Sequence, residues 1–388
     1  MAATIPVLAL TILAAGASVG PALPDNPLDG RFVFENKHCH ACHGIAGGEH
    51  AIAPRLADTS FNGSFLDLGA ALWNHVPGMS VSLEAAELPW PELSEKETAS
   101  LVAFLYFIDY LGRPGDAASG EKVFTARGCA GCHSVGGGTS VGPDLADLTR
   151  FPSPLFVARA TWNHGPAMFA TMSQRGISPA SFEEGDLADL SAFIRQKAPP
   201  GPRERVLLAP GNPNRGQELF AAKACALCHG KNARGGNEGP DLSAVDLHRS
   251  ADGIAGTMWN HAFEMNATMR QRGIGWPSFT TSELADLVAF LYFLPFTDPA
   301  GDAGRGAQVY VEHGCAGCHS DTGAEHAGPE LAGTGVVDSP EALVAKMWNH
   351  ASLMKRAILA EARPWPELTG EELRDLFAYL RQAAPVEP

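Results

Sequence analysis

Apolar residues recur at helical spacing in four segments spread along the chain. They lie three or four positions apart, the pattern of a helix with one buried face, in ETASLVAFLYF, GDLADLSAFI, SELADLVAFLYF and EELRDLFAYL. Ser94, followed three residues later by Glu97, places a capping box ahead of the first of these segments. No segment shows the alternation of apolar and polar residues that is typical of strands. The pattern therefore predicts an all-α fold.

Each of these helices closes a block of residues that occurs four times. A block begins with a short amphipathic segment and a Cys-x-x-Cys-His pentapeptide. A glycine-rich loop, a Pro-x-Leu element and a helix carrying Trp-Asn-His-x-x-x-Met follow. The pentapeptide histidines are 90, 96 and 90 residues apart, which indicates small repeated domains rather than the larger ones that the chain length alone suggests. We expect an N-terminal segment at residues 1–24 and four domains, called units 1 to 4, at residues 25–112, 113–204, 205–300 and 301–388.

The four pentapeptides contain all eight cysteines of the chain. A lone Cys-x-x-Cys suits a redox centre or half of a zinc site, but four copies that each end in histidine are the attachment signature of c-type haem. The two thiols close thioether bonds onto one haem, and the histidine binds the iron. The sequence therefore predicts four covalently bound haem c groups. Their cysteines are Cys39, Cys42, Cys129, Cys132, Cys225, Cys228, Cys315 and Cys318, and their proximal histidines are His43, His133, His229 and His319.

The order of these elements resembles the class I cytochrome c fold. The resemblance rests on a first helix that leads into Cys-x-x-Cys-His, a Gly-Pro-x-Leu loop and a last helix with the pattern Asp-Leu-x-Ala-Tyr/Phe-Leu, and it covers nearly the whole chain after Pro27. It implies that the first and last helices of each unit cross beside one haem. The usual place of the distal methionine, shortly before the last helix, instead holds Leu88-Pro89, Ser178-Pro179, Trp276-Pro277 and Trp365-Pro366.

Two kinds of residue recur in register as candidates for the sixth iron ligand. They are the methionines Met79, Met168, Met265 and Met354, and the histidines four positions earlier, His75, His164, His261 and His350. Residues i and i+4 share a helix face, so both kinds could point toward the haem, although only one can bind the iron. The resemblance favours methionine, because class I domains usually pair His with Met, and histidine is the alternative.

A tryptophan precedes these candidates in every unit, at Trp73, Trp162, Trp259 and Trp348. We expect each indole to pack against the edge of its haem, with the N–H bonded to a polar group such as a propionate. A second tryptophan precedes proline before the last helix in units 1, 3 and 4, whereas unit 2 has Ser178 there.

Features shared by alternate units favour a duplicated two-haem module. Units 1 and 3 both end in LVAFLYF, whereas units 2 and 4 end in tails rich in Ala and Pro. Residues 198–213 contain five prolines, which indicates a linker. We therefore expect two dihaem pairs, formed by units 1–2 and units 3–4, with a looser joint near residue 205.

Charge and the N-terminal segment bear on partners and location. The formal net charge of −15 argues against nucleic-acid binding, which needs basic stripes. It favours redox partners with basic docking surfaces, although acidity that only keeps the protein soluble is an equal alternative. Residues 2–19 are apolar and uncharged. They fit either a cleaved signal peptide, with Ala15-Gly16-Ala17 as its cleavage site, or a retained membrane anchor. Both fit a location in the periplasm or on the outer face of the cytoplasmic membrane, because c-type haem is attached outside the cytoplasm.

The function that these features favour is an electron relay between redox proteins, with no enzymatic machinery visible beyond the haems. Such a relay fits a subunit of a membrane respiratory or photosynthetic complex. Two alternatives remain at this point. One is a haem enzyme with an open coordination position that acts on peroxide or another small molecule, and the other is an extracellular conductive assembly of stacked chains.

Overall fold

The described part of the protein is helical. A computed structural model describes residues 23–24, 26–45, 53–58, 61, 63–138, 140–146, 153–197, 210–236, 238–245, 250–319, 328–331 and 338–383. Within these ranges the one β-bridge, between Arg234 and Asp241, extends into no strand, so the all-α prediction is confirmed. No helix in these ranges is both long and apolar enough to cross a bilayer. The apolar segment at residues 2–19 and the expected joint near residue 205 lie outside them.

Three principal helices follow one another in the same order in every unit. The first helices are α1 (Asp29–Asn36), α4 (Ala117–Ala126), α7 (Pro213–Ala222) and α11 (Ala303–Glu312). The middle helices, of 21 residues each, are α2 (Phe65–Ala85), α5 (Pro154–Gln174), α9 (Ala251–Gln271) and α12 (Pro340–Ala360). The last helices are α3 (Glu95–Phe107), α6 (Asp186–Lys197), α10 (Thr281–Tyr292) and α13 (Gly370–Ala383).

Local sequence explains where these helices begin. The hydroxyl of Ser64 accepts the backbone N–H of Asp67 at the start of α2, and serine caps begin the other three middle helices in the same way. The capping box expected at Ser94 and Glu97 is present at the start of α3. These contacts satisfy backbone donors that a helix leaves unpaired in its first turn.

The first and last helices of each unit cross at a glycine. The contacts are α1 with α3, α4 with α6, α7 with α10, and α11 with α13, which confirms the crossing that the family resemblance implied. A Cβ atom at the crossing glycine would lie far closer than 3.0 Å to a backbone carbonyl oxygen of the last helix, so the two backbones are in direct contact. The glycines are Gly30, Gly120, Gly216 and Gly306, and the facing carbonyls belong to Ser100, Asp189, Asp286 and Asp375.

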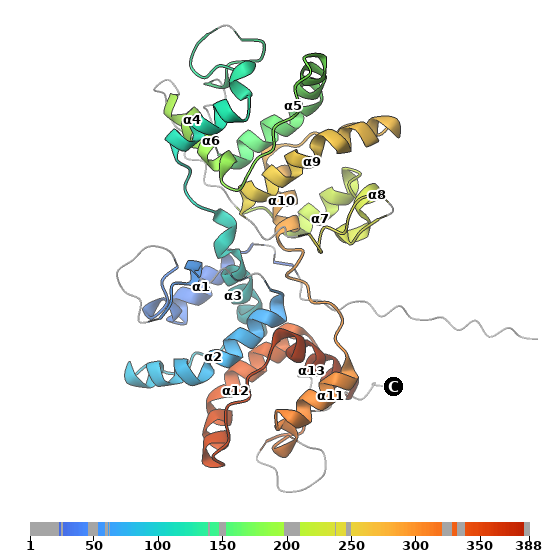
Figure 1. Cartoon of the computed structure of the whole chain (residues 1–388). Coiled ribbons are helices and arrows are strands. Elements are labelled where there is room, and N and C mark those ends of the chain that lie inside the picture. The colour runs from blue at the N-terminus through green and yellow to red at the C-terminus, as the bar shows by residue number, and fades with distance from the viewer. Residues whose placement is uncertain are drawn as a thin grey trace, which may run out of the picture.

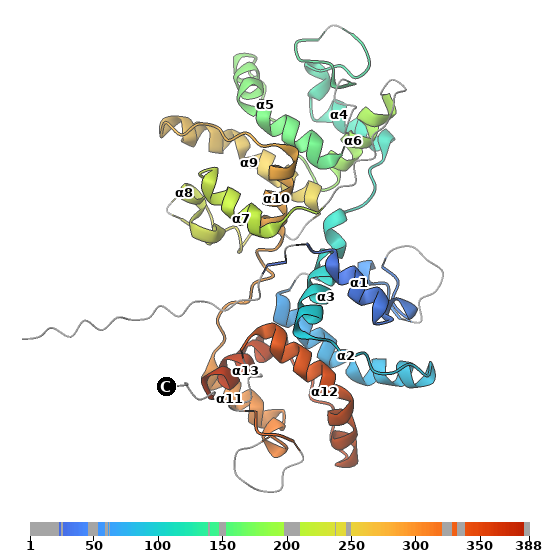
Figure 2. The same ribbon diagram turned by 180° about the vertical axis from the view of Figure 1, so that it is seen from behind.

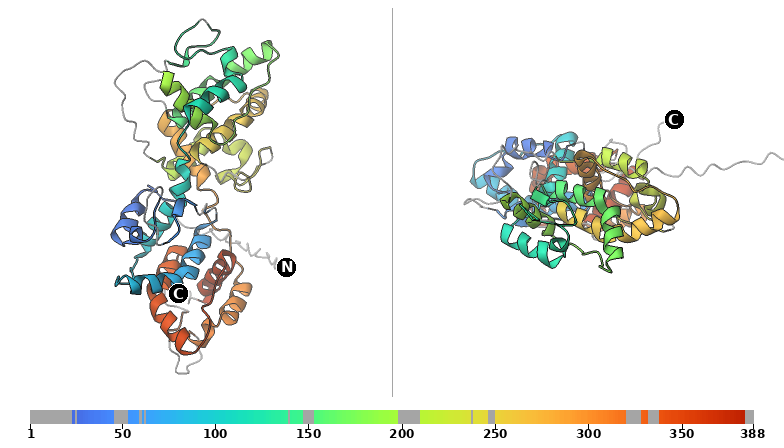
Figure 3. Two further views of the ribbon diagram at one scale, coloured as in Figure 1. Left: turned by 60° about the vertical axis from the view of Figure 1, so that its left-hand side comes forward. Right: turned by 90° about the horizontal axis from the view of Figure 1, so that it is seen from above.

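The four units form two lobes whose membership differs from the expected pairing. In Figure 1 one lobe contains α4 to α10, drawn from green to yellow, and the other contains α1 to α3 together with α11 to α13, drawn in blue and red. The view from behind in Figure 2 and the side view in Figure 3 show the same division. Helix α5 packs against α9, and α2 packs against α12 and α13. Unit 2 therefore pairs with unit 3 and unit 1 with unit 4, and the prediction of pairs 1–2 and 3–4 was wrong.

A side-chain amide explains this pairing. In the lobe of units 2 and 3, the amide of Asn163 on α5 donates to the carbonyl of Phe279 (2.8 Å) and accepts the backbone N–H of Phe279 (2.9 Å). Asn260 on α9 makes the same two bonds to Phe182, at 2.8 and 2.7 Å. In the other lobe the corresponding pairs are Asn74 with Leu368 and Asn349 with Leu93.

The tryptophan before each asparagine strengthens the same contact. Trp162 Nε1 donates to the carbonyl of Pro277 (2.9 Å), and Trp276 Nε1 donates back to the carbonyl of Trp162 (3.0 Å). The two indoles stack with ring centroids 4.4 Å apart. Trp73 with Trp365 and Trp90 with Trp348 repeat this arrangement between units 1 and 4. We call the asparagine and tryptophan contacts of one lobe its clamp.

The two lobes meet where units 1 and 3 end. Tyr106 donates its hydroxyl proton to the carbonyl of Tyr292 (3.3 Å), and Tyr292 donates to the carbonyl of Tyr106 (2.6 Å). Phe293 and Phe296 pack against the Tyr106 ring with centroids 5.3 and 5.1 Å away. Tyr106 and Tyr292 occupy the same position in the sequence LVAFLYF, which units 1 and 3 share, so equivalent residues of the two units contact each other. The half of the chain formed by units 1 and 2 therefore meets the half formed by units 3 and 4 as two subunits meet in a symmetric dimer.

A buried carboxyl lies beside this lobe junction. Asp298, in the segment that leads from unit 3 to unit 4, is only 8% exposed. One of its oxygens accepts the Ser64 hydroxyl proton (2.5 Å), and the other accepts the backbone N–H of Leu66 (3.2 Å). Burial raises the pKa of Asp298 to about 6, against the lowering effect of these hydrogen bonds and of Arg374. The folded protein thus holds a proton on Asp298 more tightly than the unfolded chain does.

This raised pKa predicts a pH-dependent stability. The stabilisation from protonated Asp298 is complete below the pKa of the unfolded group and is lost as the pH rises through about 6. We expect the free energy of unfolding to fall by about 2 kcal/mol from this residue between about pH 4 and pH 8. Denaturant titrations of the wild type and of Asp298→Asn at both pH values measure it. The variant should lose this part of the pH dependence, and an unchanged dependence would show that Asp298 ionises normally.

Candidate functional site

Each pentapeptide forms a single turn directly after the first helix of its unit. The turns are η1 (Cys39–Ala41), η4 (Cys129–Gly131), α8 (Ala226–His229) and η7 (Cys315–Gly317). A residue in the left-handed conformation precedes each turn, with φ of 63° at His38, 77° at Gly128, 67° at Ala224 and 74° at Gly314. The chain reverses sharply at this residue, and the first cysteine of each motif packs against the hydrophobic core.

All eight thiols are free and half-buried. The first cysteine of each motif packs against the hydrophobic core. Burial raises the pKa of its thiol, to about 11 for Cys39 and Cys225, and it also raises the pKa of Cys129 and Cys315. A thiol with a raised pKa stays protonated at neutral pH and is a poor nucleophile for disulfide exchange.

The pentapeptide histidines have the same hydrogen-bond partner in all four units. The Nδ1 atom of each ring faces the carbonyl of the proline in the Pro-x-Leu element. The distances are 3.2 Å from His43 to Pro54, 2.9 Å from His133 to Pro143, 3.3 Å from His229 to Pro240 and 2.8 Å from His319 to Pro329. A carbonyl can only accept, so Nδ1 carries the proton and Nε2 is left as an unprotonated metal ligand. Such a second hydrogen bond also fixes the orientation of a ligand ring.

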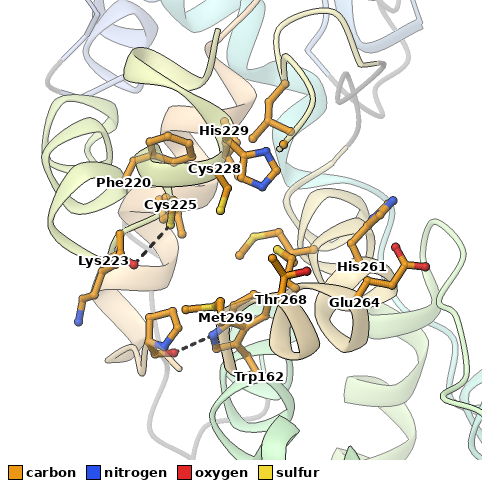
Figure 4. A pocket seen from close by; sticks show the side chains of 18 of the residues that line it. Trp162, Phe220, Lys223, Cys225, Cys228, His229, His261, Glu264, Thr268 and Met269 are labelled. Carbon is orange, nitrogen blue, oxygen red and sulfur yellow. Dashed lines mark hydrogen bonds between the residues drawn. The ribbon is translucent and has the colours of Figure 1, made fainter. Parts of the chain in front are cut away.

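Unit 3 contains a cavity of about 340 Å³ beside its pentapeptide. Figure 4 shows Cys225, Cys228 and His229 on one side of this space and Thr268, Met269 and Trp162 on the opposite side. Apolar side chains such as Phe220, Ile254 and Leu291 line much of the remaining wall. A large, mostly apolar space with two thiols and one imidazole at its edge fits a covalently attached haem. Cys225 and Cys228 would hold that haem, and His229 would bind its iron.

Both candidate distal ligands of unit 3, Met265 and His261, line this cavity. Their surroundings differ. His261 is exposed, and its Nδ1 is bonded to the carbonyl of Thr257, one turn earlier on α9 (3.0 Å). Met265 is half-buried and packs against the hydrophobic core. The other three units repeat this contrast between an exposed, backbone-bonded histidine and a half-buried methionine.

The tryptophans make contacts that were not expected. Each indole N–H has a polar partner, and this partner is a backbone carbonyl of the neighbouring unit rather than the propionate given as an example. Trp162 of unit 2 lines the cavity of unit 3, and Trp259, the corresponding residue of unit 3, does not border it. The residue of unit 2 that corresponds to Trp276 was predicted to be Ser178, and this was wrong by one position. Trp259 donates to Ala180 and Trp162 donates to Pro277, so Ala180 corresponds to Pro277. The residue before Ala180, Pro179, therefore corresponds to Trp276.

Two functional groups were missed from the sequence. The asparagines of the clamp were taken only as part of the Trp-Asn-His motif, although their identical position in all four units is a signal of a shared contact. The second group is a buried aspartate at the helix crossing of units 2, 3 and 4. Asp189 binds Arg113 (2.6 Å), and Asp286 and Asp375 bind Arg215 and Arg305 in the same way. Unit 1 has Ser100 at this place.

Comparison with known proteins agrees with this geometry. A family model described as Cytochrome c matches residues 117–198, 213–294 and 303–384. The three matches lie within units 2, 3 and 4 and together cover more than half of the chain. No curated protein and no solved structure matches the chain.

Proposed function

Because the chain belongs to the cytochrome c family, we propose that it is an electron relay with four haems, in which unit 1 is a fourth haem domain. The observation that carries this proposal is the bond from the pentapeptide histidine to the proline carbonyl, which His43 and Pro54 of unit 1 make as units 2, 3 and 4 do. Unit 1 also has the helix crossing, at Gly30. The unit departs from the others at Ser100, where they have the buried aspartate.

The contacts between units give the relay an order. Units 2 and 3 share one clamp, units 1 and 4 share the other, and units 3 and 1 meet at Tyr106 and Tyr292. Among the described residues, helices of different units pack substantially only within a lobe, and units 1 and 3 are joined instead through the side chains of the tyrosine pair. Electron transfer weakens steeply with distance, so the order 2–3–1–4 follows. Units 2 and 4 are the ends at which donor and acceptor dock.

Methionine is the distal ligand in this proposal. A haem bound by His and Met has a higher reduction potential than one bound by two histidines, which suits an exported relay. The half-buried position of Met265 beside the core favours it, since a ligand held by packing needs little reordering. In this proposal His261 binds no iron, and its ring stays bonded to the carbonyl of Thr257 within α9.

Substitution of the two candidates separates them. We expect Met265→Ala to convert one haem of four to the high-spin form and to remove its share of the sulfur-to-iron charge-transfer band in the far-red spectrum. His261→Ala, the matched control on the same helix, should leave all haems low-spin. The opposite result would make His261 the ligand. A high-spin haem in the unsubstituted protein would instead favour an enzyme with an open coordination position.

Location and partners follow from the same proposal. We propose a location outside the cytoplasm, in the periplasm or at the outer face of the cytoplasmic membrane, because c-type haem is attached there. The net charge of −15 favours partners with basic docking surfaces, within or beside a membrane complex. Electron exchange with such a partner should slow as the ionic strength rises, because salt screens the attraction.

A further inference from the structure

We propose that the tryptophan of the Trp-Asn pair acts across the unit boundary, as a residue that contacts the haem of the partner unit. This inference rests on the proposed haem function and adds to it the residue that two haem sites share. It concerns Trp73, Trp162, Trp259 and Trp348.

The cavity of unit 3 shows the arrangement directly. Trp162 lies on α5 of unit 2, and its indole crosses the boundary between units 2 and 3 to form part of the wall opposite Cys225 and His229 (Figure 4). It is 7% exposed, and Trp276 of unit 3 stacks on it from the same wall. The wall of this cavity is therefore built by both units.

The indole cannot turn toward its own unit without breaking the clamp. Its N–H is bonded to Pro277 of unit 3, and the neighbouring Asn163 holds both backbone groups of Phe279. A buried N–H without a partner costs about 1–3 kcal/mol, so the clamp holds the ring facing unit 3.

The same bonds occur in the other direction and in the other lobe. Trp259 of unit 3 donates to Ala180 of unit 2 (3.0 Å), Trp73 donates to Pro366 (2.7 Å), and Trp348 donates to Pro91 (2.7 Å). Each tryptophan is thus held on its partner unit by an equivalent bond. With haem bound, the side chains of one clamp would lie between the haem sites of units 2 and 3, and those of the other clamp between the haem sites of units 1 and 4.

The unit 2 cavity would differ in one respect. Trp259 meets Pro179 where Trp162 meets Trp276, and Phe169 covers Trp259 instead, with ring centroids 5.1 Å apart. The wall of the unit 2 site would thus contain the single indole of Trp259, whereas the wall of the unit 3 cavity contains the stacked indoles of Trp162 and Trp276. The haem of unit 2, at one end of the relay, therefore has a different wall from the haem of unit 3.

Nuclear magnetic resonance of the reduced holoprotein tests the assignment. The haem of unit 3 is identified by Overhauser contacts to the side-chain protons of Cys225 and Cys228, and that of unit 2 by contacts to Cys129 and Cys132. The Trp162 indole, recognised by the loss of its signals in Trp162→Phe, should show contacts to the haem of unit 3. Contacts to the haem of unit 2 alone, or to neither haem, would overturn the proposal.

A redox titration supplies a second readout. Trp162→Phe replaces the indole with a smaller ring, which admits water to the cavity of unit 3. Water stabilises the oxidised haem more than the reduced haem because the oxidised form carries more charge. The reduction potential of the unit 3 haem should therefore shift downward. Trp259→Phe should lower the potential of the unit 2 haem and leave that of unit 3 unchanged. Shifts confined to the haem of the substituted tryptophan's own unit would contradict the proposal. Failure of the relay itself would look different, because a haem would then be absent or would not titrate.

Discussion

Replacing Gly216 with alanine is expected to lower the free energy of unfolding by about 3 kcal/mol. A Cβ at this position would overlap the backbone carbonyl of Asp286, where α7 crosses α10. Backbone atoms of two packed helices cannot move aside as a flexible side chain can, so the helices must separate. Separation would also displace Cys225 and His229, which follow directly after α7.

Denaturant titration of the holoprotein measures this effect, and Gly78→Ala is the matched control. Gly78 lies within α2, and a Cβ there would meet no atom within 4 Å. Alanine should therefore stabilise α2 by about 0.5–1 kcal/mol, the usual cost of glycine in a helix. Equal stability of the two variants would mean that the helices do not touch at Gly216.

Replacing Trp162 with alanine is expected to cost about 3–5 kcal/mol, the range for removing a large buried aromatic side chain. The substitution removes the ring that stacks on Trp276 and the hydrogen bond to Pro277. Trp162→Phe keeps most of the packing and loses the hydrogen bond, so it should cost about 1 kcal/mol.

Gln174→Ala is the control for this pair, because Gln174 is exposed at the end of the same helix. It should change the free energy of unfolding by less than about 0.5 kcal/mol. If Trp162→Ala were as stable as this control, the Trp162 side chain would contribute nothing to the contact between units 2 and 3.

The features that the sequence predicted correctly are local. A glycine in the first helix, a pentapeptide and a proline element lie within some thirty residues of one another in each unit, and the family resemblance relates them to the last helix. The crossing of the first and last helices was expected from this order of elements, whereas the glycine at the crossing and the bond from His133 to Pro143 were not predicted. Capping residues such as Ser94 act over three positions and were predicted for the same reason.

The pairing of the units was not predictable in this way. Asn74 and Leu368, which join units 1 and 4, are 294 residues apart in the chain. Because units 1 and 3 resemble each other, as do units 2 and 4, a surface of unit 2 that fits unit 1 in a simple pair could equally fit unit 3. The short connection between units 1 and 2 favoured the wrong choice. The repeated sequence indicates that each unit has a surface for contact with another unit, but it does not indicate which two units form the contact.

The contacts of the tryptophans across the unit boundary were not predictable for a related reason. A residue that recurs beside a haem motif in every unit suggests a contact with the haem of that unit. Trp162 also belongs to a contact between units whose other half, Pro277, is repeated just as regularly. The distal ligand is a different case, because His261 and Met265 are one helical turn apart and both border the cavity. Helical spacing brings both residues to one face and does not choose between them.

The central claim, four haems that all serve electron transfer, is tested most directly by a spectroscopic redox titration of the intact protein combined with its mass. We predict a mass that exceeds the polypeptide by four haem groups, and four haems that are low-spin and titrate reversibly. A mass with three haems would show that unit 1 is not a haem domain. A haem that stays high-spin or does not titrate would contradict the relay.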